Sequence, residues 1–246
     1  MPVYEIAGLN IRINPVTPQT ARRLEPYLTD STDADFDASS NEAEIEAYIA
    51  KAKTPCLPYL AEDAIVLTNI SKEVLNSYGG CFFHSSSLAI DGEGYLFTAL
   101  SGTGKSTHAK NWRTVFGDRV TMINDDKPLI RKIDGVYMVC STPWMGKANI
   151  GCNMKAPIKA VYVLKRGEEN VAVRTSPGKQ IRQLMEATLL PSSKETMVKL
   201  LMLFDDLFNH VPLIELYCTP EPESAQVAYN AVNERSESDA ASGRLG

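Results

Sequence analysis

Short apolar runs alternate with helical patterns from residue 81 onward, and each apolar run ends in turn-forming residues. Period-two alternation predicts strands, whereas apolar residues three and four apart predict helices. Strands that alternate with helices in this way predict an α/β fold with a mixed β-sheet and flanking helices. The elements that we expect are strands over 81–90, 95–100, 120–124, 129–132, 136–139, 160–164 and 211–216, and helices over 107–116, 178–190, 193–210 and 223–232.

The first 80 residues have a different pattern. Residues 3–13 alternate as in a strand pair that turns near Gly8, and mostly helical patterns follow up to residue 77. An acidic, small-residue segment over 30–40 predicts a loop. The sequence therefore predicts three parts, which are an N-terminal α+β region (1–80) packed on the core, the core itself (81–233) and a polar, disordered tail (234–246).

Charge and hydropathy argue against two classes of partner. The net charge of −5 gives no attraction to nucleic acid or to an anionic membrane. No apolar run approaches the about 18 residues of a membrane span, and the N-terminus lacks the pattern of a signal peptide. We therefore expect a cytoplasmic protein.

The five cysteines are scattered and form no C-x-x-C pair, which argues against a disulfide framework or a zinc site.

The segment Tyr95 to Thr107, YLFTALSGTGKST, carries the most specific chemistry. An apolar run, a glycine-containing loop and a helix-forming segment follow one another, as in the phosphate-binding P-loop G-x-x-x-x-G-K-[ST]. Ala99 replaces the first glycine, which is acceptable if this position has an ordinary φ. The alternative is an exposed Gly/Ser turn before a helix. The residues expected to bind a nucleotide are Ser101, Gly102, Thr103, Gly104, Lys105, Ser106 and Thr107, with Lys105 on the terminal phosphates and Ser106 on Mg²⁺.

Two neighbouring aspartates follow the strand expected over 120–124. A carboxylate at the C-terminal end of a strand beside a P-loop is where Mg²⁺ coordination is expected. Adjacent strand residues point to opposite faces, so Asp125 and Asp126 serve one site only if the chain leaves the strand geometry there, as Lys127-Pro128 allows. One carboxylate then holds the metal while the other accepts a proton from an attacking hydroxyl. The alternative is a plain turn between strands.

A histidine is also expected near this loop. If residues 91–94 form a four-residue turn, Ile90 pairs with Tyr95, and His84 falls opposite Ser101. A lone histidine on a strand is usually structural, but this position beside the loop favours a functional role.

These segments resemble a known family. HSSSLAIDGEGYLFTALSGTGKST followed by VTMINDD is similar to the kinase core shared by HPr kinase/phosphorylase and ATP-dependent phosphoenolpyruvate carboxykinase. The resemblance implies a P-loop kinase core of that type that uses ATP and Mg²⁺. It implies that Asp125 completes the metal site with Ser106, that Asp126 is the general base, and that His84 ligates a second metal such as Mn²⁺ or contacts the transferring phosphate. Arg131 lies where the kinase has an arginine that can stabilise charge.

Two departures from the family limit what the resemblance implies. The Glu-x-Arg-Gly-x-Gly signature of HPr kinase is missing, so phosphorolysis and HPr as the substrate are not implied. The chain is far shorter than a carboxykinase, so decarboxylation is not expected either. The sequence therefore predicts an ATP-dependent kinase whose acceptor is a hydroxyl, on a protein serine or a small metabolite. The alternative is a regulatory module that binds ATP without transferring phosphate.

The segment Trp144 to Lys147 leaves two interpretations open. Trp144 and Lys147 on a Pro/Gly loop can close over a nucleotide or an acceptor by stacking and phosphate contact. A buried tryptophan next to an exposed lysine is the alternative.

Overall fold

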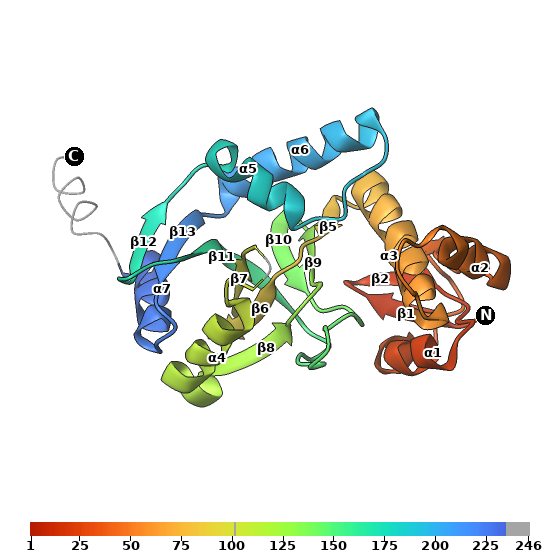
Figure 1. Ribbon diagram of the computed structural model, residues 1–246, viewed down its shortest axis with the longest axis horizontal. Helices are drawn as coiled ribbons and strands as arrows, with labels where there is room; N and C mark the ends of the chain where they lie inside the picture. Colours follow the sequence, from red (N-terminus) through yellow and green to blue (C-terminus); the bar gives the residue numbers. More distant parts are fainter. Residues whose placement is uncertain (101, 235–246) are drawn as a thin grey trace.

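Two β-sheets organise the chain, and they lie at different ends of its long axis (Figure 1). The computed structural model describes residues 1–100 and 102–234. The smaller sheet has the order β3-β1-β2-β4, and the larger sheet has nine strands, with β5-β9-β10-β11-β7-β6-β8 as its main path. The strands are β1 (Val3–Ile6), β2 (Leu9–Arg12), β3 (Leu28–Thr29), β4 (Phe36–Asp37), β5 (Gly80–Phe82), β6 (Ser86–Ile90), β7 (Glu93–Thr98), β8 (Val120–Asn124), β9 (Leu129–Ile133), β10 (Val136–Cys140), β11 (Lys155–Arg166), β12 (Val171–Arg174) and β13 (Leu213–Cys218).

Strand β11 joins the parts of the large sheet. Its first residues pair antiparallel with β10, and the remainder runs parallel to both β7 and β13. Strand β6 is antiparallel to both β7 and β8, so β7 and β8 run in the same direction. The carboxyl ends of β7, β8, β11 and β13 therefore lie along one edge, which is where α/β sheets bind ligands.

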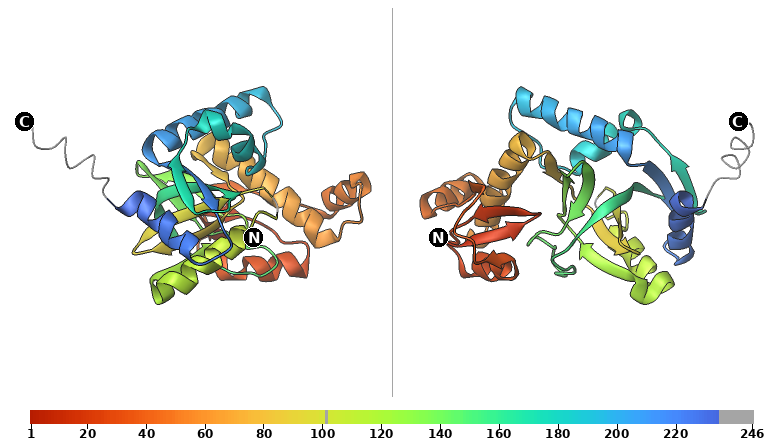
Figure 2. Two further views of the ribbon diagram at one scale, coloured as in Figure 1. Left: turned by 60° about the vertical axis from the view of Figure 1, so that its left-hand side comes forward. Right: turned by 180° about the vertical axis from the view of Figure 1, so that it is seen from behind.

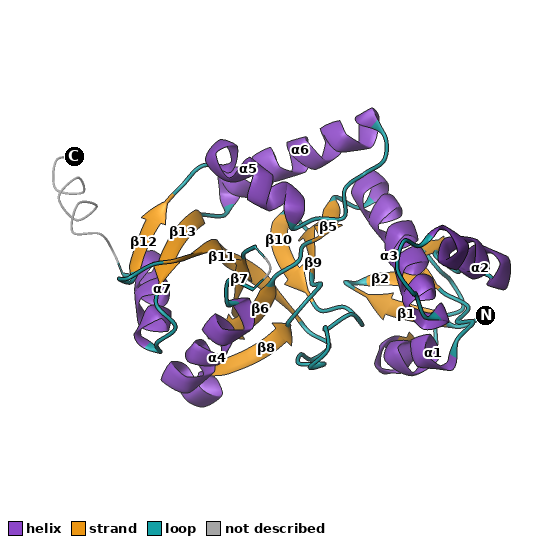
Figure 3. Cartoon of the chain, viewed as in Figure 1, coloured by secondary structure: helices purple, strands orange, loops and turns teal. Residues whose placement is uncertain are grey.

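Helices cover both faces of the large sheet (Figure 3). Helices α4 (Lys105–Phe116) and α7 (Glu223–Asn233) pack on one face, where Trp112, Phe97 and Tyr162 share an apolar cluster. Helices α5 (Pro177–Glu186) and α6 (Lys194–His210) pack on the other face, where Leu96 and Phe204 share a second cluster. Phe97 and Leu96 face opposite layers because successive strand residues alternate between the two faces.

The N-terminal region packs on the core through a third apolar cluster. Helices α1 (Pro18–Leu24), α2 (Glu42–Lys51) and α3 (Pro58–Ser77) flank the small sheet, as the two further views show (Figure 2). The cluster joins Ile11 and Val66 of this region to Phe82, Leu129 and Trp144 of the core. Removing such apolar surface from water stabilises the contact by about 25 cal/mol per Å².

The mixed α/β fold with flanking helices that the sequence predicts is confirmed, but the predicted hairpin is wrong in two respects. Residues 81–90 form two strands rather than one, because the N–H groups of His84 and Ser85 donate outside the sheet, to Ala187 O (2.6 Å) and Asp126 O (3.1 Å). The turn has only two residues, Asp91 and Gly92, both with positive φ as in a type I′ turn.

The shorter turn shifts the register by two residues. Ile90 pairs with Glu93, and Leu88, rather than Ile90, pairs with Tyr95. Strand β12 is not predicted from the sequence, and the expected loop over 30–40 contains the short strand β4. The predicted tail from residue 235 onward, like Ser101, lies outside the described residues. Within the described ranges, no helix is both long and apolar enough to cross a membrane.

Candidate functional site

The loop between β7 and α4 has the backbone geometry that its glycines suggest. Gly102 and Gly104 have φ values of +78° and +115°, in the left-handed region that glycine adopts most readily. Ala99 has no positive φ, so alanine fits at the position where the motif has its first glycine. Ser101, predicted to bind nucleotide, lies outside the described residues. The loop leads directly into α4, and the first N–H groups of a helix lack partners within the helix. Such groups bind anions.

Lys105 begins α4 and lies against the loop. Its Nζ donates to the carbonyl oxygen of Ala99 at 3.4 Å. Burial lowers the pKa of Lys105, and the negative charges of Asp126 and Asp125 oppose that shift. The ammonium group is therefore held between the loop and the aspartate pair.

Asp125 contacts two hydroxyl groups. Ser106 Oγ donates to Asp125 Oδ2 at 3.0 Å, and Ser86 Oγ donates to Asp125 Oδ1. Ser86 is fully buried at the start of β6. One carboxylate oxygen and one serine hydroxyl thus lie side by side at the beginning of α4. Hard oxygen donors of this kind, completed by phosphates and water, suit Mg²⁺. No group of three histidine, cysteine, aspartate or glutamate side chains that could hold a metal occurs in residues 1–100 and 102–234.

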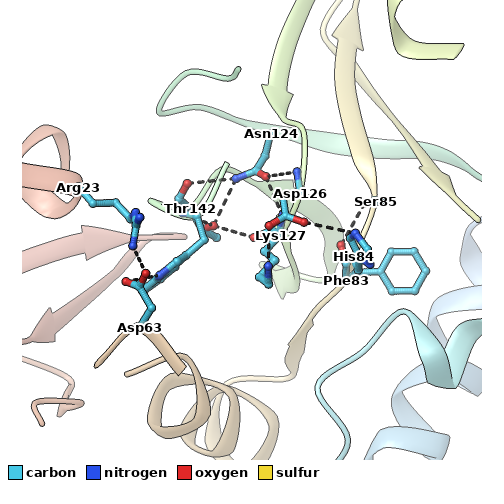
Figure 4. A network of polar contacts seen from close by, with 10 residues as sticks. Arg23, Asp63, Phe83, His84, Ser85, Asn124, Asp126, Lys127 and Thr142 are labelled. Atoms are coloured by element: carbon cyan, nitrogen blue, oxygen red, sulfur yellow. Dashed lines mark hydrogen bonds and ion pairs between the residues drawn. The ribbon is translucent and has the colours of Figure 1, made fainter. Parts of the chain in front are cut away.

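Asp126 lies between two cationic or potentially cationic side chains (Figure 4). His84 Nε2 is 3.3 Å from Asp126 Oδ1, and Lys127 Nζ is 2.5 Å from Asp126 Oδ2. Burial would raise the pKa of Asp126, but the hydrogen bonds from His84 and Lys127 outweigh it, so the pKa is lowered. Asp126 is therefore ionised at neutral pH.

Asn124 makes the chain leave the strand before the aspartates. Its Oδ1 accepts hydrogen bonds from the N–H groups of Asp126 and Lys127, both at 2.9 Å, and its Nδ2 donates to Thr142 O at 3.1 Å. Because this side chain caps the turn, both aspartates face the same cavity, the condition under which the sequence predicts one shared site.

A cavity of about 510 Å³ brings most of the predicted residues together. It is lined by His84, Gly102, Gly104, Lys105, Ser106, Thr107, Asp125, Asp126, Gly146, Lys147 and Ala148. A second cavity of about 430 Å³ lies on the other side of the loop and includes Thr103 and Arg166 in its lining. Arg166, at the end of β11, donates to Gly102 O at 2.8 Å.

Arg131 is placed elsewhere, contrary to its predicted role at the site. Its guanidinium donates to the carbonyl oxygens of Ala7 (2.9 Å) and Gly8 (3.3 Å) and lies over the Tyr78 ring. Arg131 lies on β9, and this strand directs it toward the N-terminal hairpin rather than the loop.

The segment after β10 combines both interpretations that the sequence allows. Trp144 is buried with 5% of its surface exposed and packs against Phe82, so it does not stack on a ligand. Lys147 and Gly146 line the cavity of about 510 Å³. No role at the site is predicted from the sequence for Gly146 or Ser86, and Lys127 is predicted only to help the chain leave the strand. The glycine between Trp144 and Lys147 was the available signal for a close backbone approach.

Comparisons with known proteins find similarity among solved structures alone. No protein-family model matches the chain, and no curated protein matches it in sequence. Among solved structures, the Hpr(Ser) kinase/phosphatase from Coxiella burnetii is similar over 67% of this chain and 98% of that chain, with 11% sequence identity and a TM-score of 0.39. This agreement identifies no family, and the kinase assignment stays a prediction that rests on the residues of the loop and of the aspartate pair.

Proposed function

We propose that this protein binds ATP with Mg²⁺ and transfers the terminal phosphate to a hydroxyl group of an acceptor, a protein serine or a small hydroxylated metabolite. The observation that carries the proposal is the placement of Ser106, Asp125 and Asp126 in one cavity with the start of α4. A metal-binding pair and a second carboxylate beside a phosphate-binding loop are the parts that phosphoryl transfer requires.

The two cavities beside the loop support a nucleotide rather than phosphate alone. The phosphates would contact the N–H groups at the start of α4 and the Lys105 ammonium group. The cavity of about 430 Å³ on the other side of the loop has room for the nucleoside. Arg166 holds the Gly102 carbonyl between the two cavities and so keeps the loop in place.

Mg²⁺ would be held by Ser106 Oγ and Asp125, and it would neutralise the charge of the phosphates during transfer. Ser86 fixes the orientation of Asp125 by donating to its other oxygen. The remaining catalytic contribution of the chain is to position the reactants and to stabilise charge.

Asp126 would accept a hydrogen bond from the hydroxyl of the acceptor. Its lowered pKa makes it a weak base, which suits the orientation of a hydroxyl better than early removal of its proton. Phosphoryl transfer through a loose transition state needs little base assistance, so this weakness is compatible with catalysis. His84, at 3.3 Å from the same carboxylate, is next to the position where the transferred phosphate would pass.

One observation favours the alternative of a nucleotide-binding module without catalysis. Both oxygens of Asp126 already have partners, His84 on Oδ1 and Lys127 on Oδ2. An acceptor hydroxyl must share one of them or displace Lys127. A module that only binds nucleotide would leave Asp126 in these contacts permanently.

Transfer of labelled phosphate from ATP into a cell extract tests the proposal. The wild-type protein is expected to label a protein or a metabolite, whereas Asp126→Asn is expected to bind Mg-ATP normally and to label nothing. Normal binding by both proteins with no transfer by either, in any acceptor mixture, would contradict the kinase proposal and support the binding module.

A further inference from the structure

A buried carboxylate of the N-terminal region is connected to the cavity of about 510 Å³ that contains Asp126. Asp63 lies on α3 and exposes 7% of its surface. It forms an ion pair with Arg23 of α1, and its Oδ1 accepts a hydrogen bond from Trp144 Nε1 at 3.1 Å. A buried carboxylate is costly unless it has such partners. Figure 4 shows Arg23 and Asp63 at one end of a polar network whose other end is His84 and Asp126.

Trp144 carries the connection into the core. Its indole packs edge-on against Phe82, with ring centroids 6.0 Å apart and an interplanar angle of 88°. Its carbonyl oxygen accepts the N–H of Lys127 at 3.2 Å. Thr142 Oγ1 donates to the carbonyl oxygen of Lys127 at 2.6 Å and accepts the N–H of Trp144 at 3.4 Å. The segment that contains Trp144 therefore contacts both peptide groups of Lys127, whose N–H is also accepted by Asn124 Oδ1 at 2.9 Å.

Asp126 is held from two sides by the same segment. Lys127, whose backbone Trp144 and Thr142 fix, places its Nζ 2.5 Å from Asp126 Oδ2. Gly146, two residues beyond Trp144, approaches so closely that a Cβ there would lie 3.1 Å from Asp126 Cβ. The position of Trp144 therefore contributes to the position of the carboxylate, together with Asn124, which accepts the N–H of Asp126, and His84.

We propose that Asp63 is a positioning residue for the cavity that contains Asp126. Asp63 acts through Trp144 on Asp126 and on the segment that carries Lys147. The inference rests on the proposed function, because Asp126 is the group that the acceptor would contact. The N-terminal region is accordingly part of the catalytic unit, since its helices α1 and α3 supply Arg23 and Asp63.

Glu62 provides a matched control, because it is the neighbouring buried carboxylate on the same helix. Its oxygens accept hydrogen bonds from the N–H groups of Val16 (2.6 Å) and Thr17 (2.9 Å), within the N-terminal region. Both Glu62→Gln and Asp63→Ala remove a buried charge from α3. Only Asp63→Ala breaks the contact with Trp144, so a loss of turnover specific to that variant separates positioning from plain stability.

The experiment compares thermal unfolding, the Kd of Mg-ATP and the rate of phosphate transfer for Asp63→Ala, Asp63→Asn, Trp144→Phe and Glu62→Gln. We expect the transfer rate to fall about tenfold for Asp63→Ala and Trp144→Phe, with the Kd within about twofold of wild type, because a displacement of about 1 Å can cost 100-fold. Asp63→Asn keeps an oxygen that accepts from Trp144 and should restore most of the rate.

Hydrogen exchange of the Lys127 amide tests the positioning without any turnover. Its N–H is shared between Trp144 O (3.2 Å) and Asn124 Oδ1 (2.9 Å), so its exchange should accelerate about twofold or more in Asp63→Ala, which releases Trp144, and remain unchanged in Glu62→Gln. Unchanged exchange in Asp63→Ala, or an equal loss of transfer rate in Glu62→Gln and Asp63→Ala, would overturn the inference. Accelerated exchange together with no transfer by the wild type would instead refute the proposed function alone.

Discussion

Substitution of Gly146 by alanine should lower the rate of phosphate transfer while leaving most of the stability intact. Gly146 has a φ of +73°, and this left-handed conformation costs about 1 kcal/mol in an alanine. The new Cβ would lie 3.1 Å from Asp126 Cβ, whereas ordinary contacts begin near 3.4 Å, so Asp126 must move by about 0.3 Å. If a shift of about 1 Å costs 100-fold, a shift of this size costs about fourfold in rate.

Gly135→Ala is the control for this prediction. Gly135 has a φ of +82° in the turn between β9 and β10, and a Cβ there would meet nothing within 4 Å. Both variants should lose about 1 kcal/mol of stability, a fall of about 2–4 °C in Tm for a chain of this size. The assays are thermal unfolding and transfer of labelled phosphate. Equal transfer rates in the two variants would refute the claim that Gly146 sets the position of Asp126.

Three further predictions concern other parts of the molecule. Burial lowers the pKa of His108 to about 3, so only the unfolded state takes up a proton below about pH 6.5. Stability should therefore be complete above pH 6.5 and be lost as the pH falls toward 3, by about 2 kcal/mol at pH 5. Urea unfolding at pH 7 and 5 should show this loss diminished in His108→Gln, and an equal loss would contradict the assignment. Ser86→Ala should raise the Mg²⁺ concentration needed for ATP binding several-fold, because Asp125 loses a hydrogen bond that orients it; an unchanged Mg²⁺ titration would disprove this role. Arg166→Met should weaken ATP binding about tenfold, since it removes a charged hydrogen bond to Gly102 O worth about 1.5 kcal/mol, and an unaltered Kd would count against it.

The elements around the loop could be predicted because their signals are local. The apolar alternation of β7, the glycines of the loop and the apolar spacing of α4 occur within one short segment. The strand expected over 120–124 is β8 with the same bounds. Asp125 and Asp126 follow it directly, so their approach to the loop required only that β7 and β8 run in the same direction.

His84 was predicted beside the loop for the wrong structural reason. The expected pairing of Ile90 with Tyr95 assumed a four-residue turn, but Asp91 and Gly92 make the turn alone. His84 reaches Asp126 because the chain leaves the sheet between β5 and β6. Asp91-Gly92 is also the dipeptide that favours a two-residue type I′ turn, and such a turn gives the observed register.

The contacts that link distant segments could not be predicted from local patterns. Arg131 is five residues beyond Asp126, and its neighbours depend on how the N-terminal hairpin packs against β9. Arg166 reaches the loop because β11 lies beside β7, although these strands are more than 50 residues apart in the chain. The contact of Trp144 with Asp63 likewise depends on the packing of α3 against the core. The order of strands in the sheet and the packing of helices determine these contacts. The spacing of residues within one segment predicts neither the strand order nor the helix packing.

Calorimetric titration with Mg-ATP tests the central claim, that the loop between β7 and α4 binds the phosphates of a nucleotide. The comparison is between wild type, Lys105→Ala and Lys110→Ala, since both lysines lie on α4 but only Lys105 lines the loop-side cavity of about 510 Å³. We expect one ATP per chain for wild type and Lys110→Ala, and binding at least about tenfold weaker for Lys105→Ala because a charged contact is lost. No binding by the wild type, or equal binding by all three proteins, would contradict the assignment of this loop.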